Sequence, residues 1–324
     1  MRIAIVGAGM AGLSCGVRLR DAGVDVTVVD KGRGPGGRTS TRRAAVPFDH
    51  GAQYFTARDG AFQAAVVDWL SRGIVAEWMP RVVAFDGADD PRAASDLPRF
   101  VGVPGMNALA IDMASRLDVR TGVTVSALYR RTDGWHLATA ADESIGPFDA
   151  VLLTPPPPQT ATLLADHPFA SVVRTAEVAP CWAVMTSWAD AVPVAFDAAF
   201  VNEGPLSWVA RDGGKPGRPH PHTWVLHASP TWSIEHLEQT PDEVLPALLQ
   251  AFESLVRAPL PALAFSAAHR WRYASVPRPL AETHLWDGTA GLGVAGDWCG
   301  GPRVEGAWLS GRALADALVR TSSR

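Results

Sequence analysis

The sequence has little of what marks several common protein classes. Its 324 residues include three cysteines, Cys15, Cys181 and Cys299, which form neither an even framework nor a CxxC pair. That spacing excludes a disulfide scaffold, so free buried thiols are expected. No apolar run approaches the length that crosses a bilayer. The N-terminus also lacks a signal-peptide pattern, so the chain is predicted to be cytosolic and not membrane-bound.

An excess of basic charge is absent as well. The net charge is -4 and no stripe of Lys and Arg is visible, which excludes a typical nucleic-acid binder. The sequence contains no HExxH or Walker pattern. His220, His222 and His227 lie in or near a loop rich in Gly and Pro, without acidic or Cys partners at ligand spacing, so no metal site is predicted. The composition, 47% hydrophobic and 19% charged, is that of a globular protein.

What is present begins with alternating strands and helices. Residues 2–6 (RIAIV) form an apolar run of strand length, residues 10–22 a helix that stops at Gly23, and residues 24–29 (VDVTVV) a second strand. A right-handed crossover makes these two strands parallel. Further elements are predicted as helices at 61–72 and 105–117, and as strands at 123–129, 134–140 and 148–154.

The second half of the chain changes character. Four prolines at 155–158 are expected to break strand and helix alike, and we interpret them as a crossing between domains. Seven of the twelve Trp lie between 182 and 286, in strand-like segments. Residues 240–243 (TPDE) predict a capping box at the start of a helix. The sequence therefore predicts an α/β protein of two domains. A discontinuous nucleotide-binding domain (1–66, 99–160 and 266–324) holds an inserted substrate domain with a mixed sheet (67–98 and 161–265).

The first helix opens on a glycine pattern. Gly7, Gly9 and Gly12 form GxGxxG directly after a strand, and Asp30 ends the next strand about 20 residues on, as in the dinucleotide fingerprint. The glycines let the backbone and the helix N-terminus approach a pyrophosphate, whose negative charge the helix dipole favours. Asp30 is expected to accept hydrogen bonds from both hydroxyls of an adenosine ribose. The pattern suits NAD and FAD equally.

The next two segments favour FAD. DKGRGPGGR (30–38) supplies glycines for a tight loop and two arginines, Arg33 and Arg38, as forked donors to phosphates. This segment resembles the RxGGR element of the flavin amine oxidase superfamily. DHGAQYFT (49–56) resembles the DxGA segment of the same superfamily. The resemblance implies that this segment passes beside the isoalloxazine ring, with Gln53 and Tyr54 near the flavin.

A second anion-binding turn lies near the other end of the chain, in GDWCGGPRVEGAWLSG (296–311). Similar flavoproteins place the aspartate of the Gly-Asp pair, here Asp297, at the ribityl or phosphate end of FAD. The following helix points its N-terminus at the flavin N1 and C2 carbonyl. The resemblance implies that the backbone N–H groups of Val304, Glu305 and Gly306 stabilise the negative charge of the reduced flavin. FAD is long enough to need both helix N-termini.

The order of the motifs sharpens the resemblance. GAGMAG, DKGRGPGGR, DHGAQYFTARD, FVGVPGMNALA, WRYA and GDWCGGPRVEGAWLSG together resemble the renalase family, most closely its bacterial members. This implies the fold of p-hydroxybenzoate hydroxylase and a non-covalent FAD, so a packed thiol is expected at Cys299. It also implies oxidation of NAD(P)H isomers reduced at ring carbon 2 or 6, with hydride transfer to flavin N5 and reoxidation by O2 to H2O2. The predicted cofactor-binding residues are Gly7, Gly9, Met10, Ala11, Gly12, Asp30, Lys31, Arg33, Gly37, Arg38, Ala52, Gln53, Tyr54, Val125, Asp297, Arg303, Val304, Glu305 and Gly306.

The substrate side is defined less sharply by the sequence. A nicotinamide needs a flat apolar slot with few polar anchors, and hydride transfer needs no strong general base, so no catalytic side chain is assigned. Arg211, Lys215 and Arg218 suit either substrate phosphates or a solvated basic loop. The candidates for the flavin and substrate environment, some of which also suit an ordinary core, are Gln53, Tyr54, Trp182, Trp208, His227, His269, Trp271 and Tyr273.

Three hypotheses remain open at this point. The first is a renalase-like oxidase whose partners are a small-molecule substrate and O2. The second is an amine oxidase, which usually has an aromatic cage, or a desaturase, which tends to be longer and to have a membrane-facing apolar surface. The third is a sensor or scaffold that holds FAD without turnover. A helix N-terminus directed at flavin N1 favours a redox cycle over the third hypothesis.

Overall fold

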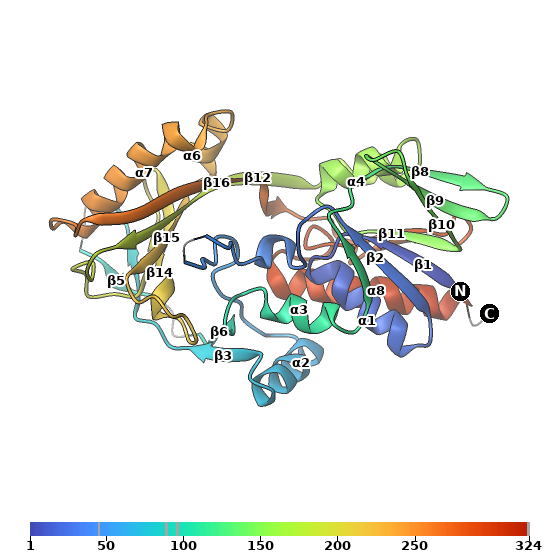
Figure 1. Ribbon diagram of the computed structural model, residues 1–324, viewed down its shortest axis with the longest axis horizontal. Coiled ribbons are helices and arrows are strands. Elements are labelled where there is room, and N and C mark those ends of the chain that lie inside the picture. The colour runs from blue at the N-terminus through green and yellow to red at the C-terminus, as the bar shows by residue number, and fades with distance from the viewer. Residues whose placement is uncertain (45, 88–89, 95–96, 323–324) are drawn as a thin grey trace.

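The first sheet is built from the apolar runs that the sequence marks as buried strands. The computed structural model describes residues 1–44, 46–87, 90–94 and 97–322 (Figure 1). Neighbouring strands pair in parallel except at the β17 edge, as expected of strands joined by crossovers. In spatial order the six strands are β17 (Leu285–Asp287), β18 (Leu292–Val294), β11 (Ala150–Leu153), β1 (Arg2–Val6), β2 (Asp25–Asp30) and β7 (Asp118–Thr121).

Both faces of this sheet are covered, which explains its continuous apolar strands. Alternate residues of β1 point to opposite sides: Ile3 and Ile5 join one buried cluster, and Ala4 and Val6 join another. The first cluster is closed by α1 (Met10–Asp21), α3 (Ala108–Ala114) and α8 (Arg303–Ser322). The second is closed by α4 (Pro157–Leu164), α5 (Phe169–Val173) and a three-stranded sheet of β8 (Val125–Arg131), β9 (Gly134–Thr139) and β10 (Ser144–Phe148).

The first and last helices of the chain lie side by side (Figure 1). A Cβ on Gly311 of α8 would stand 2.0 Å from the carbonyl oxygen of Ala11 in α1, so only glycine allows this approach. The hydroxyl of Ser14 donates a 2.7 Å hydrogen bond to the carbonyl of Trp308 across the same contact. The crossing brings the N-terminal halves of both helices to one region of the domain.

The second sheet carries the tryptophan-rich segments. One of its faces packs on α7 (Pro241–Val256) through Val244, Leu248 and Phe252, and α6 (Pro230–Glu235) lies on the same side (Figure 1). The opposite face turns to the first domain, where Trp208 and Ala210 join its core. The seven strands, in spatial order, are β16 (Leu263–Arg278), β12 (Glu177–Trp188), β15 (Thr223–Ala228), β14 (Leu206–Arg211), β13 (Ala198–Val201), β4 (Val82–Phe85) and β5 (Arg92–Ala93).

Smaller elements connect the two sheets. Two strands, β3 and β6, pair with each other between them, and α2 begins at the N-cap Asp59, whose carboxylate accepts the N–H groups of Ala61 and Phe62. None of the described helices has the length and apolarity needed to cross a membrane. The bounds of these elements are α2 (Gly60–Ser71), β3 (Val75–Trp78), β6 (Arg99–Gly102), and the 3-10 turns η1 (Gly37–Thr39) and η2 (Asp212–Gly214).

The α/β architecture with a Rossmann-like domain and a sheet-rich second domain is confirmed, and two details differ from expectation. The prolines at 155–158 do not break the chain: Pro156 is the N-cap of α4 and Pro157 is its first residue. The first turn of a helix uses no backbone N–H, so proline is tolerated there. The chain first enters the second sheet at β4 and β5, and after α5 it returns to that sheet at β12. The predicted return to the first domain at 266 falls inside β16, which pairs with β12 down to Arg278. Residues 88–89, 95–96 and 323–324 of the predicted domain segments lie outside the described residues.

Candidate functional site

The three glycines of the first turn have three different environments. Gly7 has φ +106, and a Cβ there would meet the Thr154 hydroxyl at 2.5 Å. A Cβ on Gly12 would stand 1.9 Å from the carbonyl oxygen of Gly7. Gly9, the N-cap of α1, has nothing within 4 Å of its Cβ position. Gly7 and Gly12 therefore shape the turn, while Gly9 keeps the backbone open at the helix N-terminus, beside Met10 and Ala11, which are buried in α1.

Asp30 fixes the loop beside this turn. Its Oδ2 accepts the N–H of Ala8 and its Oδ1 accepts the N–H of Gly32, both at 2.6 Å. The N–H of Gly36 donates to the carbonyl of Ala8 at 2.8 Å, which lays the glycine-rich loop against the first turn. The expectation that both oxygens await ribose hydroxyls was thus incomplete, because each already accepts one backbone N–H.

Three other predicted residues lie near Asp30 or in the loop that follows it. Lys31 and Arg33 are exposed in the glycine-rich loop. The N–H of Val123 donates to the carbonyl of Asp30, and Val125 follows two residues later at the start of β8. Exposed cations and free backbone edges are what a nucleotide end requires.

The C-terminal turn repeats the geometry of the first. A Cβ on Gly306 would stand 2.0 Å from the carbonyl oxygen of Gly301, five residues earlier, as Gly12 does to Gly7. Gly301, like Gly9, has nothing within 4 Å of its Cβ position. Arg303 opens α8 with φ +81, a conformation that is uncommon for a residue with a side chain. Both helices therefore begin with an exposed backbone edge.

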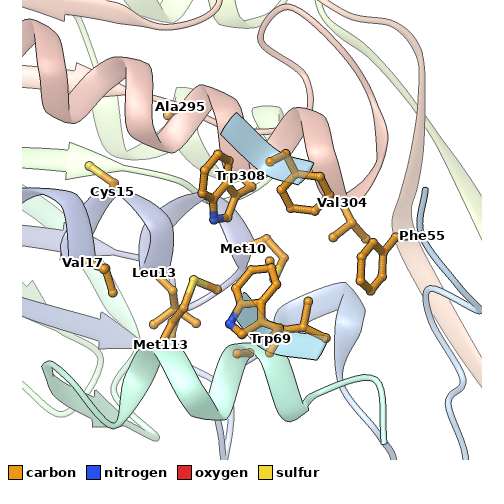
Figure 2. Close-up of a cluster of buried hydrophobic side chains, with 14 of the residues drawn as sticks. Met10, Leu13, Cys15, Val17, Phe55, Trp69, Met113, Ala295, Val304 and Trp308 are labelled. Atoms are coloured by element: carbon orange, nitrogen blue, oxygen red, sulfur yellow. The ribbon is translucent and has the colours of Figure 1, made fainter. Parts of the chain in front are cut away.

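Side chains behind this second turn anchor it to the first domain. Val304 is buried in the cluster of Figure 2, where Met10 of α1, Trp308 of α8 and Phe55 gather. The carboxylate of Glu305 accepts the N–H groups of Arg58 and Asp59, both at 2.7 Å. This ties the start of α8 to the loop that leads into α2.

Arg38 and Asp297 meet each other. The guanidinium donates to both carboxylate oxygens at 2.8 and 2.6 Å, and one of its nitrogens also donates to the carbonyl of Ala274 at 3.3 Å. Both residues were predicted to contact FAD from opposite ends of the sequence. The structure brings them together and pairs them, which leaves the lone pairs of Asp297 and the outer N–H groups of Arg38 for further partners.

These features fit an FAD. Two helix N-termini carry an open glycine, Gly9 and Gly301, each backed by a tightly packed one. Each helix N-terminus therefore leaves room for a phosphate or a carbonyl group to approach its backbone N–H groups. A Cβ at the open glycine would block that approach. Arg38 and Asp297 join two of the sequence motifs through their hydrogen bonds and offer the polar groups that a ribityl or phosphate segment needs.

The 49–54 segment is held rigidly between the domains. The N–H of Ala52 donates to the carbonyl of Arg38 at 2.9 Å. The amide nitrogen of Gln53 donates to the carbonyls of Asp49 and Gly51. Tyr54 lies 5.5 Å from the ring of Trp208 in the second sheet. The predicted flavin-facing residues are therefore fixed from both sides.

A buried group of four charges lies under this segment. The ammonium of Lys215 donates to Asp212 at 2.7 Å and to the Gln53 side-chain oxygen at 3.2 Å, and lies 3.5 Å from Asp49. Arg218 donates to Asp49 as well. The side chains of Asp49, Asp212 and Lys215 are at most 1% exposed. The solvated-loop hypothesis fits Arg211, an exposed partner of Asp197, but Lys215 and Arg218 are neither solvated nor open to a substrate phosphate.

The two carboxylates of this group differ in their proton affinity. Burial alone would raise the pKa of Asp49, but the charges of Lys215 and Arg218 and the N–H of Met106 together hold the pKa below its ordinary value. Burial raises the pKa of Asp212, against the attraction of Lys215. Sequence reasoning missed this cluster. The available signal was the rarity of lysine, which occurs only at 31 and 215.

The candidates in the second sheet divide between its two faces. His269, Ala183, His227 and Trp208 are cross-strand neighbours in one row over β16, β12, β15 and β14. Successive side chains alternate, so Trp182, next to Ala183, points to the other face. There it packs in the α7 core and donates to the carbonyl of His236 at 3.0 Å. Trp182 is thus a core residue, and its selection as a substrate contact was wrong.

At the His269 end of this row, side chains of the second sheet form an aromatic cluster with His50 of the 49–54 segment. The carbonyl of His50 accepts the indole N–H of Trp271 at 2.9 Å and the ring nitrogen of His227 at 3.3 Å. The rings of His50, His269 and Trp271 lie 4.5–4.9 Å apart. We call these four residues the histidine–tryptophan cluster. Tyr273 is half-buried on the same strand two residues beyond Trp271.

Thiols and metals play no visible part in this arrangement. Burial raises the pKa of all three cysteine thiols, that of Cys181 to about 12, so they are poor nucleophiles. Among the residues that the structure describes, no three His, Cys, Asp or Glu side chains are placed to hold a metal ion.

The comparisons with known proteins agree with this geometry. Residues 5–69 match the NAD(P)-binding Rossmann-like domain model, and residues 72–319 match the model for flavin containing amine oxidoreductase. A proposed protoporphyrinogen oxidase from Exiguobacterium sp. 255-15 superposes with TM-score 0.78 at 15% identity, over 99% of both chains. An oxidoreductase from Methanosarcina mazei superposes with TM-score 0.71 at 14% identity, over 98% of this chain and 100% of that one. A putrescine oxidase variant superposes with TM-score 0.73 at 14% identity, over 99% of both chains. The chain belongs to the flavin containing amine oxidoreductase family and is an FAD-dependent oxidoreductase.

Proposed function

We propose that this oxidoreductase oxidises isomeric dihydronicotinamide dinucleotides, reduced at ring carbon 2 or 6, to NAD(P)+. The proposal extends the family assignment by the ordered motifs that resemble renalases. In this proposal the second substrate is O2, the product is H2O2, and FAD is bound without a covalent link. When bound, FAD supplies a two-electron acceptor that O2 restores.

One observation carries the proposal: Arg42 forms no ion pair with a carboxylate among the described residues, and its charge acts on two rings of the histidine–tryptophan cluster, His50 and His269. Burial lowers the pKa of both His50 and His269, and the positive charge of Arg42 adds to the effect at each ring. Asp49, the carboxylate next in sequence to His50, is already bound by Arg218 and Lys215. A site of neutral rings with an available guanidinium suits a flat neutral ring that carries phosphates.

The same surroundings disfavour a cationic amine. An amine oxidase would offer aromatic faces to a substrate ammonium group. Here the guanidinium of Arg99 already lies 5.3 Å from the ring centre of Tyr54, and the ammonium of Lys215 lies 5.8 Å from that of Trp78. These aromatic faces are occupied by cations of the chain itself.

The residues of this chain would bind and orient the reactants. Gly9 and Gly301 admit the cofactor to two helix N-termini, and Arg38 with Asp297 would hold its middle. The fixed amide of Gln53 would present one face of the 49–54 segment to the flavin. Trp271 and His269 would bound a flat slot, and Arg42 would hold a substrate phosphate. Hydride transfer then needs alignment of the donor carbon and exclusion of water, and no proton acceptor.

An anaerobic reduction experiment tests the proposal. Purified holoenzyme is mixed with borohydride-reduced NAD, which contains the 2-, 4- and 6-dihydro isomers, and the flavin absorbance is followed. Pure 4-dihydro NADH is the control. Rapid bleaching by the mixture alone is the expected result. Bleaching by both would indicate an ordinary NADH-dependent enzyme and would contradict the proposal.

Absence of bleaching by either reagent would also contradict it. The second assay is then hydrogen peroxide production from primary amines and polyamines, which tests the amine oxidase hypothesis. A chain that binds FAD and is reduced by none of these compounds would support a binding role without turnover.

A further inference from the structure

His50 carries a ring nitrogen that the protein leaves without a partner. The residue is 5% exposed, and its Nδ1 is buried with no hydrogen-bond partner among the described residues. Buried polar atoms in folded proteins are almost always paired, and an exception calls for an explanation. A ligand atom is one explanation, because the His50 ring lies 4.8 Å from the ring of His269 and 4.9 Å from that of Trp271, the two residues that would bound the substrate slot in the proposed function.

The imidazole is neutral at ordinary pH. Burial lowers the pKa of His50 to about 3, with further contributions from the charges of His269, Arg42 and His227 against that of Asp49. A neutral imidazole has one N–H donor and one acceptor nitrogen. A single ring nitrogen either donates or accepts, so Nδ1 as the acceptor is complemented by a neutral N–H donor, and no charge is needed on either side.

The neighbours of His50 hold this imidazole in place. Its ring lies 4.9 Å from that of Trp271 at 36° and 4.8 Å from that of His269 at 76°. The backbone carbonyl of the same residue receives both Trp271 and His227, so the three side chains are tied to one point of the chain. An unpartnered nitrogen on so fixed a ring can select a ligand by direction as well as by chemistry.

We infer that His50 is a specificity-determining residue whose Nδ1 accepts a hydrogen bond from the carboxamide N–H of the nicotinamide ring. This inference rests on the proposed function. A primary amide offers one carbonyl acceptor and N–H donors in one plane, which matches a neutral imidazole. The flat ring that bears the amide is suited to the slot beside Trp271.

The experiment compares two probes on the oxidised holoenzyme. NAD+ carries the carboxamide, and 3-acetylpyridine adenine dinucleotide keeps the carbonyl but has no amide N–H. Dissociation constants are obtained from the change in flavin absorbance on titration. The wild type is expected to bind NAD+ ~10-fold more tightly than the acetylpyridine analogue, the effect of one buried hydrogen bond.

Two variants assign that preference to His50. His50→Phe keeps an aromatic ring without a nitrogen and is expected to bind both probes equally, through weaker binding of NAD+ alone. His50→Asn places a polar atom near the position of Nδ1 and is expected to restore part of the preference. If His50→Phe does not retain FAD, His50→Leu takes its place with the same expectation.

The outcomes separate the inference from the proposed function. A preference that persists in His50→Phe, or a wild type that binds both probes equally, overturns the role of His50 and leaves the proposed function standing. A wild type that binds neither probe and is not reduced by the dihydro isomers overturns both.

Discussion

Arg38 and Asp297 lie 259 positions apart in the sequence and form two hydrogen bonds, of 2.8 and 2.6 Å. One follows the glycine-rich loop after β2, and the other follows β18 in the same sheet. The pair joins an early and a late cofactor motif of the chain. The Arg38 side chain is 29% exposed and that of Asp297 is 9% exposed. A forked guanidinium and a carboxylate share this geometry, which a lysine cannot reproduce.

Arg38→Lys is therefore expected to weaken FAD binding by ~10-fold or more, because at least one charge-assisted hydrogen bond is lost while the charge is kept. Fluorescence titration of the apoprotein with FAD measures the effect. Arg43→Lys, in an exposed position of the same segment, is the matched control and should bind FAD as the wild type does. Wild-type affinity in Arg38→Lys would mean that the pair has no part in the cofactor site.

Alanine substitutions at Gly9 and Gly12 distinguish space left for a ligand from space filled by protein atoms. Gly9→Ala meets no protein atom within 4 Å and keeps an ordinary φ of -83, so the apoprotein should be as stable as the wild type or slightly more stable. FAD binding should fall at least ~10-fold, since the methyl group would occupy the approach to the helix N-terminus. Thermal unfolding of the apoprotein and FAD titration give the two quantities.

Gly12→Ala provides the contrast to Gly9→Ala. Its Cβ would stand 1.9 Å from the Gly7 carbonyl, so it should lower the free energy of unfolding of the apoprotein by about 1–3 kcal/mol. A Gly9→Ala variant that binds FAD normally would show that the open space at the helix N-terminus is not where the cofactor lies.

The sequence was sufficient for the parts of the fold that rest on local patterns. The apolar run before Gly7 and the capping box at Thr240 each predict an element by its own periodicity or end signals. The prediction that the prolines at 155–158 break a helix was wrong, because proline, which is excluded from the interior of a helix, is accepted in its first turn. Position within the element, and not residue type alone, decided the outcome.

Contacts that depend on tertiary placement lay beyond local patterns. His227 and Trp182 both come from alternating strands, and only the register of β12 with β15 and β16 shows that they face opposite sides of the sheet. Lys215 follows a Gly-Gly turn that is typical of a solvated loop. Its burial depends on Asp49, 166 residues earlier, and no local pattern records that pairing.

Lys215→Met should destabilise the protein by about 3–5 kcal/mol, because it leaves Asp49 and Asp212 less well paired in a buried site. Urea unfolding followed by tryptophan fluorescence measures the change. Arg211→Met is the matched control on the same loop: its partner Asp197 and Arg211 itself are 24% and 45% exposed, so about 0–1 kcal/mol is expected. Equal effects of the two substitutions would contradict the buried-charge description.

The acid sensitivity of the second sheet is expected to depend on His227. Burial lowers its pKa to about 4 in the folded protein, whereas an unfolded histidine takes up its proton near pH 6.5. Between these values the unfolded chain binds more protons, so the free energy of unfolding falls as pH decreases. The expected slope is about 1.4 kcal/mol per pH unit from this one residue, and the contribution vanishes above pH ~6.5.

His227→Gln separates this effect from acid unfolding in general. Glutamine keeps an N–H donor for the carbonyl of His50 and cannot titrate, so the wild type should lose stability relative to His227→Gln as pH decreases from ~6.5 to ~4. Urea unfolding at stepped pH gives both curves, and His220→Gln, an exposed histidine of the preceding loop, is the matched control. Carboxylates such as Asp49 lose stabilising charge at still lower pH and affect all three proteins alike. Curves for wild type and His227→Gln that stay parallel through this range would mean that the folded protein admits a proton at His227, and that the histidine–tryptophan cluster is open to water.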